Sequence, residues 1–144
     1  GITTSDALIR GGLSTCDVND PNCPILSGQT NDYDIIFSSL CLEAACLTVE
    51  LFGKTIERLV RLLKPGGLLL LLMVRNESFY YVNQDKFFCL PINESIIEQA
   101  FDKTNELIDI HIDRTDTKID DQKRNTTSDF DGLMVNAHSN ESSE

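Results

Sequence analysis

The chain has 144 residues, of which 41% are apolar and 24% charged, a balance typical of a folded domain rather than a disordered segment. Twelve Lys and Arg residues against 23 Asp and Glu residues give a formal net charge of -11, which argues against binding to nucleic acid or to an anionic membrane surface. Its longest apolar run is too short to span a bilayer and no signal segment opens the chain, so we expect a cytosolic (cytoplasmic) protein.

The first third of the chain predicts two short strands separated by a loop. Residues 1–12 are polar, and we expect them to form a loop or the frayed end of a larger unit that has been cut. Leu13–Val18 predicts a short strand that ends beside an acid, and residues 19–32 carry the Pro, Gly and Asn residues of a long loop. Tyr33–Ser39 predicts a buried strand, because three consecutive apolar residues form its centre.

A helix followed by a central strand comes next. Residues 48–63 carry apolar side chains at helical spacing, and the Lys-Pro-Gly-Gly sequence at 64–67 ends the helix. Leu68–Val74 is an unbroken apolar run, which is typical of a strand buried on both faces at the centre of a parallel sheet.

A hairpin and a second helix follow the central strand. Phe79–Val82 and Phe87–Leu90 flank a polar turn, as the two strands of a hairpin do. Residues 91–93 open the second helix, with Asn93 as its N-cap and an apolar inner face formed by Ile96, Ile97, Ala100 and Phe101.

The last part of the chain predicts two closing strands. Leu107–Ile112 alternates as an edge strand does, Thr115–Ser128 is a polar loop, and Phe130–Ala137 is a final strand before a disordered tail at 139–144. The order of elements predicts an α/β fold. Since no GxG sequence follows a strand, residues 13–138 resemble the second half of a doubly wound domain.

The five cysteines do not predict a metal site. Cys41 and Cys46 match neither a CxxC nor a zinc spacing, and the chain has two histidines to assist them. We expect the cysteines to be reduced and mostly buried thiols, at positions 16, 23, 41, 46 and 89.

Several short sequences resemble one enzyme family. They are Cys16-Asp17-Val18, SLCLEAAC at 39–46, LLKPGG at 62–67 and SFYY at 78–81. They are similar to the nicotinamide, phenylethanolamine, indolethylamine and thioether methyltransferases, which methylate small molecules with S-adenosyl-L-methionine. The resemblance runs over residues 14–138 and covers the C-terminal half of a full family member. It implies a Rossmann-like α/β methyltransferase domain with a mixed sheet, flanking helices and an added hairpin.

The resemblance implies three residues at the cofactor. Asp17 and Val18 match the acid and its neighbour that hold the adenine, where a carboxylate accepts from the exocyclic amine and a backbone N–H donates to the ring. Ser39 matches a small residue beside the cofactor. Without the resemblance, Asp17 and Val18 are equally well explained as a capped strand end.

The resemblance also implies a substrate site of the amine type. Glu43 and Glu77 match two glutamates that engage the amine and hydroxyl in the phenylethanolamine branch, and Tyr80 matches a pocket tyrosine. A cation facing two carboxylates and an aromatic ring is physically sensible recognition. Asp129 is the candidate for a third substrate acid. Taken alone, each glutamate is most simply a solvated acid.

A nicotinamide-type pyridine substrate remains an alternative, although two positions argue against it. Met73 stands where the nicotinamide branch has an aspartate that holds the carboxamide, and Cys89 replaces the serine that assists it. An amine substrate is therefore favoured.

The expected reaction is an in-line transfer of a methyl group to nitrogen, which needs orientation and a proton acceptor but no metal and no protein nucleophile. We assign no catalytic residue, and we expect a monomeric enzyme when full length. Because the family's Gly-rich loop and N-terminal lid are not in this sequence, we expect the isolated chain to be inactive. Two alternatives stay open: a truncated, non-catalytic relative that acts as an interaction module, and an unrelated acidic α/β binding domain.

Overall fold

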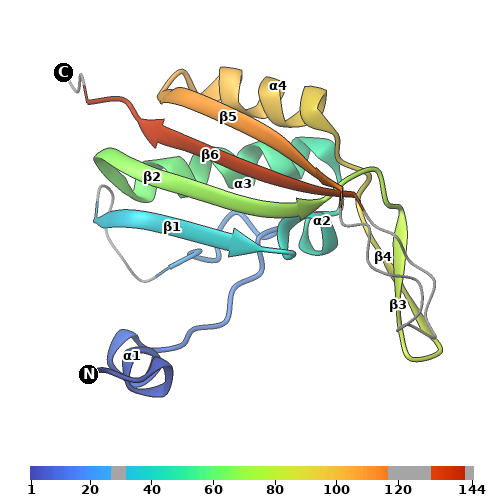
Figure 1. Cartoon of the computed structure of the whole chain (residues 1–144), viewed down its shortest axis with the longest axis horizontal. Helices are drawn as coiled ribbons and strands as arrows, with labels where there is room; N and C mark the ends of the chain where they lie inside the picture. The colour runs from blue at the N-terminus through green and yellow to red at the C-terminus, as the bar shows by residue number, and fades with distance from the viewer. Residues whose placement is uncertain (27–31, 117–130, 142–144) are drawn as a thin grey trace.

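The computed structural model describes residues 1–26, 32–116 and 131–141, and a four-stranded sheet lies at its centre (Figure 1). In spatial order the strands are β1 (Tyr33–Ser39), β2 (Leu63–Val74), β6 (Asp131–Ser139) and β5 (Leu107–Asp116). β1 runs parallel to β2, whereas β6 runs antiparallel to both of its neighbours. The α/β class, the mixed sheet and the interior position of β2 are as expected. The expectation of a parallel sheet with β2 buried on both faces is wrong, because β6 is antiparallel to β2 and alternate residues of β2 are only half-buried.

Two helices cover one face of this sheet, α3 (Val49–Leu62) and α4 (Glu94–Thr104) (Figure 1). The strands alternate accordingly: every second residue of β2 and β6 is buried against the helices. Phe52 of α3 and Phe101 of α4 are among the largest fully buried side chains. The hydrophobic core therefore lies in a single layer between the sheet and this pair of helices.

Both helices begin at side-chain caps. Thr48 accepts from the backbone N–H of Leu51 at 3.1 Å, and Asn93 accepts from that of Ile96 at 2.9 Å, which confirms Asn93 as the N-cap. The first long helix ends at Leu62, so the Lys-Pro-Gly-Gly sequence forms the start of β2 rather than part of a loop.

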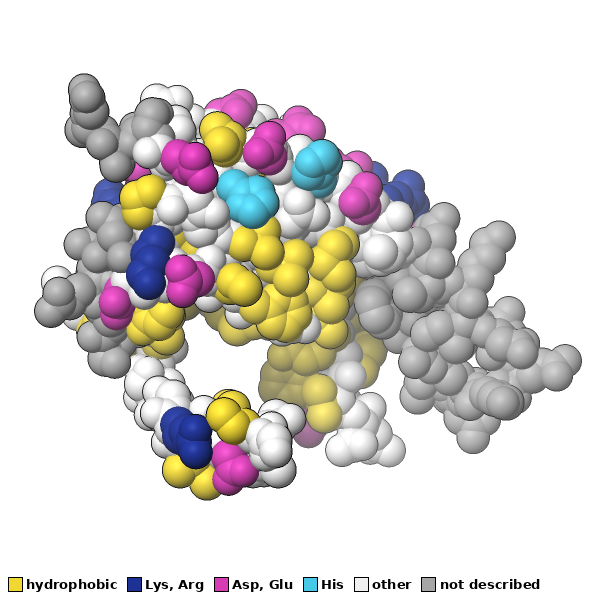
Figure 2. Space-filling model, turned by 60° about the vertical axis from the view of Figure 1, so that its left-hand side comes forward, with side chains coloured by type: hydrophobic (Ala, Val, Ile, Leu, Met, Phe, Trp, Pro, Cys, Tyr) yellow, Lys and Arg dark blue, Asp and Glu magenta, His cyan; other side chains and the backbone are white. Residues whose placement is uncertain are grey.

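The other face of the sheet is apolar and uncovered by the described residues. Ile35 and Phe37 of β1 are 61% and 57% exposed. Their register partners on β2, Leu68 and Leu70, also point away from the helices, so this side of both strands is uncovered by the described residues. Figure 2 shows hydrophobic side chains gathered on this face beside the two histidines. The expected bounds of β1 are confirmed, but the expectation that it is a buried strand is wrong: within this strand Ile36 alone is buried.

The N-terminal segment differs from the expectation in two places. Residues 1–12 contain a helix, α1 (Thr4–Gly11), which starts with a capping box between Thr3 and Asp6 and buries none of its residues. Leu13–Val18 does not form a strand. Because a strand needs a paired neighbour and β1 is paired with β2 alone, the chain at 17–23 closes local turns instead.

A two-stranded hairpin projects from the sheet at the end where β2 finishes (Figure 1). It consists of β3 (Phe79–Val82) and β4 (Asp85–Phe88), joined by a turn in which Asn83 has φ 57°. The hairpin is confirmed, although its second strand begins and ends two residues earlier than expected. Every residue of both strands is exposed.

The closing strands confirm the expected order, with β5 at the edge of the sheet and β6 beside β2. The expected loop at 115–128 lies outside the described residues except for its first two, which belong to β5. The expected disordered tail at 139–144 begins too early, because Ser139 is the last residue of β6 and pairs with Leu107. The part of that tail beyond residue 141 lies outside the described residues. In the part of the chain that the structure describes, no helix is long and apolar enough to cross a membrane.

The five thiols are free, and they are less buried than expected. Cys46 and Cys89 are buried, whereas Cys16 and Cys41 are exposed and Cys23 is half-buried. The expectation of mostly buried thiols is therefore wrong, because Cys16 and Cys23 lie in a surface loop and Cys41 precedes a helix at the edge of the core.

Candidate functional site

A short helix, α2 (Leu42–Ala45), carries the first substrate candidate at the carboxyl end of β1. Leu40 takes a left-handed conformation, with φ 51°, and its N–H donates to the carbonyl of Leu72 at 2.8 Å. This turn brings the chain back over the end of β2, so that Glu43 is 2% exposed. The interpretation of Glu43 as a solvated acid is therefore wrong, because tertiary packing encloses it.

The carboxyl group of Glu43 is buried without full hydrogen bonding. Among the described residues its Oε2 atom has no hydrogen-bond partner. Burial raises the pKa of Glu43, and hydrogen bonds from the backbone of Glu43 and of Val74 lower it in part. A buried acid with an unsatisfied oxygen favours a ligand that can donate a hydrogen bond or bring a positive charge.

Glu77, the second substrate candidate, follows the end of β2 and is half-buried. Burial raises the pKa of the Cys89 thiol, and the negative charges of Glu43 and Glu77 raise it further. Both glutamates are therefore close enough to Cys89 to act on it electrostatically.

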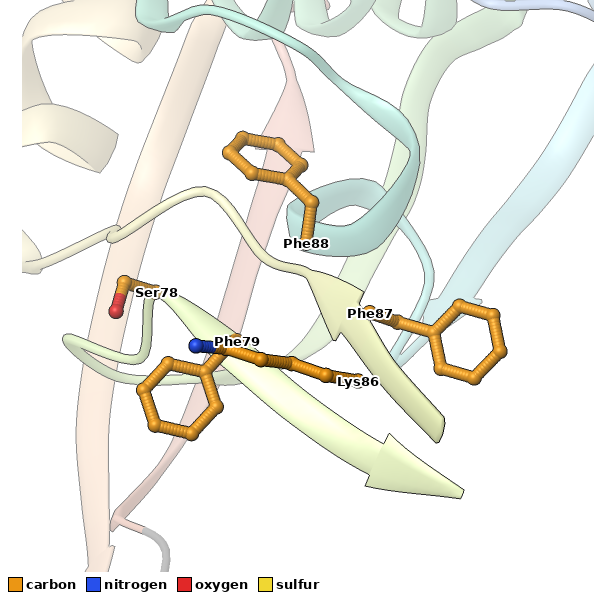
Figure 3. Close-up of a pocket in the computed structure, with 5 residues that line it drawn as sticks. All are labelled: Ser78, Phe79, Lys86, Phe87 and Phe88. Atoms are coloured by element: carbon orange, nitrogen blue, oxygen red, sulfur yellow. The ribbon is translucent and has the colours of Figure 1, made fainter. Parts of the chain in front are cut away.

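The hairpin is joined at its base by the residues that flank it. The backbone N–H of Cys89, just after β4, donates to the carbonyl of Ser78, just before β3, at 3.0 Å. Figure 3 shows the residues that line the shallow, open hollow at this base: Ser78, Phe79, Lys86, Phe87 and Phe88. The lining of the hollow is therefore mainly aromatic, with one lysine, and includes neither glutamate.

The hollow contains a cation–π contact between a lysine and an aromatic ring of the hairpin. The Nζ atom of Lys86 lies 4.3 Å from the centroid of the Phe79 ring, on the same side of the hairpin (Figure 3). Such a cation over a ring face is held by the charge distribution of the aromatic system. Tyr80 stacks on Phe87 with centroids 5.4 Å apart and is 41% exposed, and it does not line the hollow.

The adenine candidates lie in the turn that precedes β1. Asp17 is exposed, and its Oδ1 atom accepts from the backbone N–H of Asn19 at 3.0 Å. Val18 is half-buried and packs against the core. The exposed carboxylate and the anchored neighbour fit the adenine end of S-adenosylmethionine, because one can accept from an amine while the other holds the backbone in place.

Asn19 is a site-positioning residue that the sequence interpretation missed. Its Nδ2 group donates to the carbonyl of Ala45 at 2.8 Å, and its Oδ1 accepts from the backbone N–H of Leu47 at 3.2 Å. These bonds fasten the turn with Asp17 and Val18 to the end of α2, the helix that carries Glu43. The two groups of candidates therefore belong to one end of the sheet.

The remaining candidates have different outcomes. Ser39 is exposed in the last position of β1, opposite Leu72 in register, two residues before the α2 cap. Asp129 lies outside the described residues. Met73, at the position that separates the amine and nicotinamide branches, is 1% exposed within the hydrophobic core.

An ion-pair network lies beside the site at the end of β2, and nothing in the sequence pattern indicated it. The Nε atom of Arg75 lies 2.5 Å from Oε1 of Glu94, at the start of α4. The Nη1 atom of Arg75 lies 3.8 Å from Oδ2 of Asp131, at the start of β6. Arg114 pairs with the same aspartate at 2.6 Å. Within the described ranges no cluster of three or more metal-binding side chains occurs.

Comparison with known sequences adds a family and several relatives. The model of the NNMT/PNMT/TEMT family matches residues 6–138. The chain is 33% identical to human nicotinamide N-methyltransferase over 85 residues, which covers 59% of the chain and 32% of that protein. It is 31% identical to human phenylethanolamine N-methyltransferase over 86 residues, which covers 58% of the chain and 30% of that protein. The chain thus spans about a third of the length of these curated relatives.

Comparison with solved structures identifies the fold. A SAM-dependent methyltransferase from Methanosarcina mazei aligns with a TM-score of 0.59 at 14% identity, over 80% of this chain and 63% of that chain. Phosphoethanolamine N-methyltransferase 2 from Haemonchus contortus, solved with S-adenosyl-L-methionine, aligns with a TM-score of 0.55 at 18% identity, over 79% and 35%. The α/β arrangement is that of these methyltransferase domains.

Proposed function

The chain belongs to the NNMT/PNMT/TEMT family, and we propose that it is part of an enzyme that transfers a methyl group from S-adenosylmethionine to the nitrogen of a small amine. One observation supports the choice of an amine: the buried carboxyl group of Glu43 has an oxygen without a hydrogen-bond partner among the described residues, and the half-buried Glu77 precedes an aromatic hairpin. Two carboxylates and aromatic faces are complementary to an ammonium group.

The cofactor end of the proposed site is the turn at Asp17 and Val18. The Asp17 carboxylate would accept from the exocyclic amine of the adenine, and the backbone at Val18 would donate to its ring. Ser39, at the end of β1, offers a small side chain beside the cofactor. When bound, S-adenosylmethionine supplies an electrophilic methyl group.

The amine end must orient a nitrogen lone pair and accept a proton. An ammonium cannot attack a methyl group, so the substrate has to lose a proton before or during transfer. Glu43 and Glu77 are the proposed acceptors, directly or through water, and they also hold the nitrogen in line. The lining residues of the hollow would enclose the organic part of the amine, and Tyr80, which stacks on the lining residue Phe87, would support that wall.

A nicotinamide-type substrate is the weaker proposal. Met73 occupies the position of the carboxamide-binding aspartate, and it is enclosed in the core at 1% exposure. Human nicotinamide N-methyltransferase is nevertheless a relative at 33% identity, so pyridines belong among the test substrates. The cytosolic location and the monomeric state of the whole enzyme remain predictions.

Matched substitutions test the amine proposal. We expect Glu43→Gln and Glu77→Gln each to weaken binding of a phenylethylamine by roughly tenfold or more, because a hydrogen bond to a charged group contributes about 1.5–3 kcal/mol. Glu98→Gln, an exposed acid on α4, is the control with the same change of charge. Titration calorimetry measures binding, and mass spectrometry of the amine measures methyl transfer in the presence of S-adenosylmethionine.

Two results would contradict the proposal. Unchanged amine affinity in both glutamine variants would remove the assigned roles of Glu43 and Glu77. Methylation of a pyridine in preference to any amine would favour the nicotinamide-type alternative. Because the chain spans about a third of its relatives' length, the assay is to be run on this chain and on the protein isolated from its natural source.

A further inference from the structure

Two cysteines of the N-terminal turn, Cys16 and Cys23, lie close together near the protein surface. The backbone N–H of Asp17 donates to the sulfur of Cys23 at 3.3 Å, which places that sulfur one residue from Cys16. Two consecutive turns produce this approach: the N–H of Asp20 donates to the carbonyl of Asp17 at 3.2 Å, and the N–H of Cys23 donates to that of Asp20 at 3.1 Å. The chain thus returns on itself within eight residues.

Cys16 and Cys23 are both free thiols, and Cys23 lies close enough to Cys16 to affect its titration. Burial raises the pKa of the Cys16 thiol, the neighbouring Cys23 raises it further, and the positive charge of Arg58 acts in the opposite direction. Cys16 is exposed and Cys23 half-buried, so small reagents in solution can reach the pair.

Arg58 of α3 holds the turn in this conformation. Its guanidinium donates to the carbonyl of Asp20 at 3.4 Å and to the carbonyl of Cys23. These bonds hold the backbone on either side of Asn22, and with it Cys23, next to the start of the turn. A turn that keeps two cysteines close favours closure of a bond between them, because less chain entropy is lost on closure.

We propose that Cys16 and Cys23 form an oxidisable dithiol that closes a reversible disulfide when it meets a small disulfide such as oxidised glutathione. The thiolate of Cys16 attacks one sulfur of glutathione disulfide, which breaks its S–S bond and releases one glutathione thiolate. Cys23 then attacks the mixed disulfide at the Cys16 sulfur and releases the second. The two thiol protons pass to the two glutathione molecules, so two cysteines are oxidised as one glutathione disulfide is reduced.

The remaining cysteines lack this arrangement. Cys41 is exposed, but its sequence neighbour Cys46 is fully buried, with its sulfur facing the hydroxyl of Thr55 at 3.7 Å. Cys89 is 3% exposed. Selective closure at Cys16 and Cys23 is therefore expected, with Cys41 as an internal comparison for simple exposure.

The disulfide would enclose the turn that carries Asp17 and Val18. This consequence rests on the proposed function, since these two residues are the proposed adenine contacts. The disulfide itself does not depend on that function, because it follows from the proximity of the Cys23 sulfur to the Cys16–Asp17 backbone. Its formation and its effect on adenosine binding are therefore separate measurements.

Peptide mapping after oxidation tests the pair directly. The chain is incubated with oxidised glutathione, remaining thiols are alkylated, and the protein is cleaved before aspartates. Asp17 and Asp20 lie between the cysteines, so cleavage separates a peptide ending at Cys16 from one containing Cys23, and Asp34 separates both from Cys41 and Cys46. We expect a cross-linked pair of peptides joining Cys16 to Cys23, lighter than its separate thiols by two hydrogens and released by a reducing agent.

Two variants sharpen the result. Cys23→Ser should leave Cys16 as a stable mixed disulfide with glutathione, and Arg58→Met should slow closure by loosening the turn. The proposal is overturned if wild-type Cys16 ends as a mixed disulfide without closure, or if Cys41 reacts while Cys16 and Cys23 stay reduced. Since both of these outcomes are read in the wild-type protein, the test does not depend on the folding of either variant.

Discussion

The backbone N–H of Leu90 donates to the carbonyl oxygen of Glu43 across 2.6 Å. This bond joins the chain that leaves the hairpin to the short helix at the end of β1, two segments separated by the whole of α3, β2 and the hairpin. Because it uses the backbone of Glu43, the side chain of Glu43 can be changed without breaking it. Substitutions of that carboxyl group therefore test its chemistry more than its place in the fold.

Glu43→Gln should change how stability depends on pH. Burial raises the pKa of Glu43, so the folded protein keeps this proton at pH values where the unfolded chain has released it. The free energy of unfolding of the wild type should then fall as pH rises from the ordinary value of 4.5 through the raised pKa, whereas the glutamine variant should lack this decline. Urea unfolding across that range measures it, and Glu98→Gln is the control. Parallel curves for wild type and Glu43→Gln would contradict the prediction.

Glu94→Gln should have the opposite pH signature. The hydrogen bond from Arg75 lowers the pKa of Glu94, so the folded protein holds the carboxylate at pH values where the unfolded chain is protonated. Its stabilising effect is present above the ordinary value and is lost as pH falls through the lowered pKa. We expect wild type to lose stability more steeply than Glu94→Gln on acidification, as followed by circular dichroism. An identical steepness in both proteins would show that the pair does not contribute.

Asn19→Ala should detach the Asp17–Val18 turn from α2. The variant loses the half-buried bond to Ala45 and the exposed bond to Leu47, and a typical intramolecular hydrogen bond contributes about 0.5–1.5 kcal/mol to stability. Hydrogen exchange of the Leu47 amide should accelerate, and the midpoint of urea unfolding should fall. Asn19→Asp keeps the acceptor for Leu47 but loses the donor to Ala45, so an intermediate effect is expected. Unchanged exchange at Leu47 in Asn19→Ala would contradict this role.

Two glycine-to-alanine changes should have opposite signs. A Cβ atom at Gly67 would lie 2.9 Å from the carbonyl oxygen of Lys64 and 3.1 Å from that of Asp34, so Gly67→Ala should destabilise the start of β2. Gly53 lies within α3 with no atom within 4 Å of such a Cβ, and alanine there should stabilise the protein by about 0.4–1 kcal/mol. Thermal unfolding of both variants measures the difference. A rise in melting temperature for Gly67→Ala would contradict the geometry at that strand.

The elements with strong periodicity were predictable from the sequence alone. The helical spacing at 48–63 and the cap at Asn93 gave α3 and α4, because both helices bury one apolar stripe against the sheet. The bounds of β1 were also predictable from its apolar centre. Its exposure was not, since the covering of a strand depends on other segments and a local pattern carries no information about them.

The errors in the N-terminal segment have the same cause. Leu13–Val18 has the composition of a strand, but no described strand pairs with it, and the chain forms turns instead. The helix at Thr4–Gly11 carried a signal in its Thr3 and Asp6 capping box that the polar composition concealed.

The residue types of the candidate site were predictable from the sequence, but the contacts that these residues make were not. The family resemblance pointed to Glu43 and Glu77, yet the burial of Glu43 and the influence of both acids on Cys89 arise from tertiary packing. Asn19 gave no signal, because one polar residue in an Asp- and Pro-rich loop does not indicate a partner 26 positions away. The approach of the Cys23 sulfur to the Asp17 amide was equally hidden, since the spacing of Cys16 and Cys23 matches no known framework.

Every residue of β3 and β4 is exposed, so the sequence of the hairpin is not constrained by core packing. Folding is governed by the sheet and by α3 and α4, whereas the hairpin adds aromatic surface without adding to the core. Mutations in the hairpin would therefore change the stability of the fold little, and natural selection for folding would tolerate them. Descendants of such a gene could diverge in the molecules that they admit while inheriting the same scaffold.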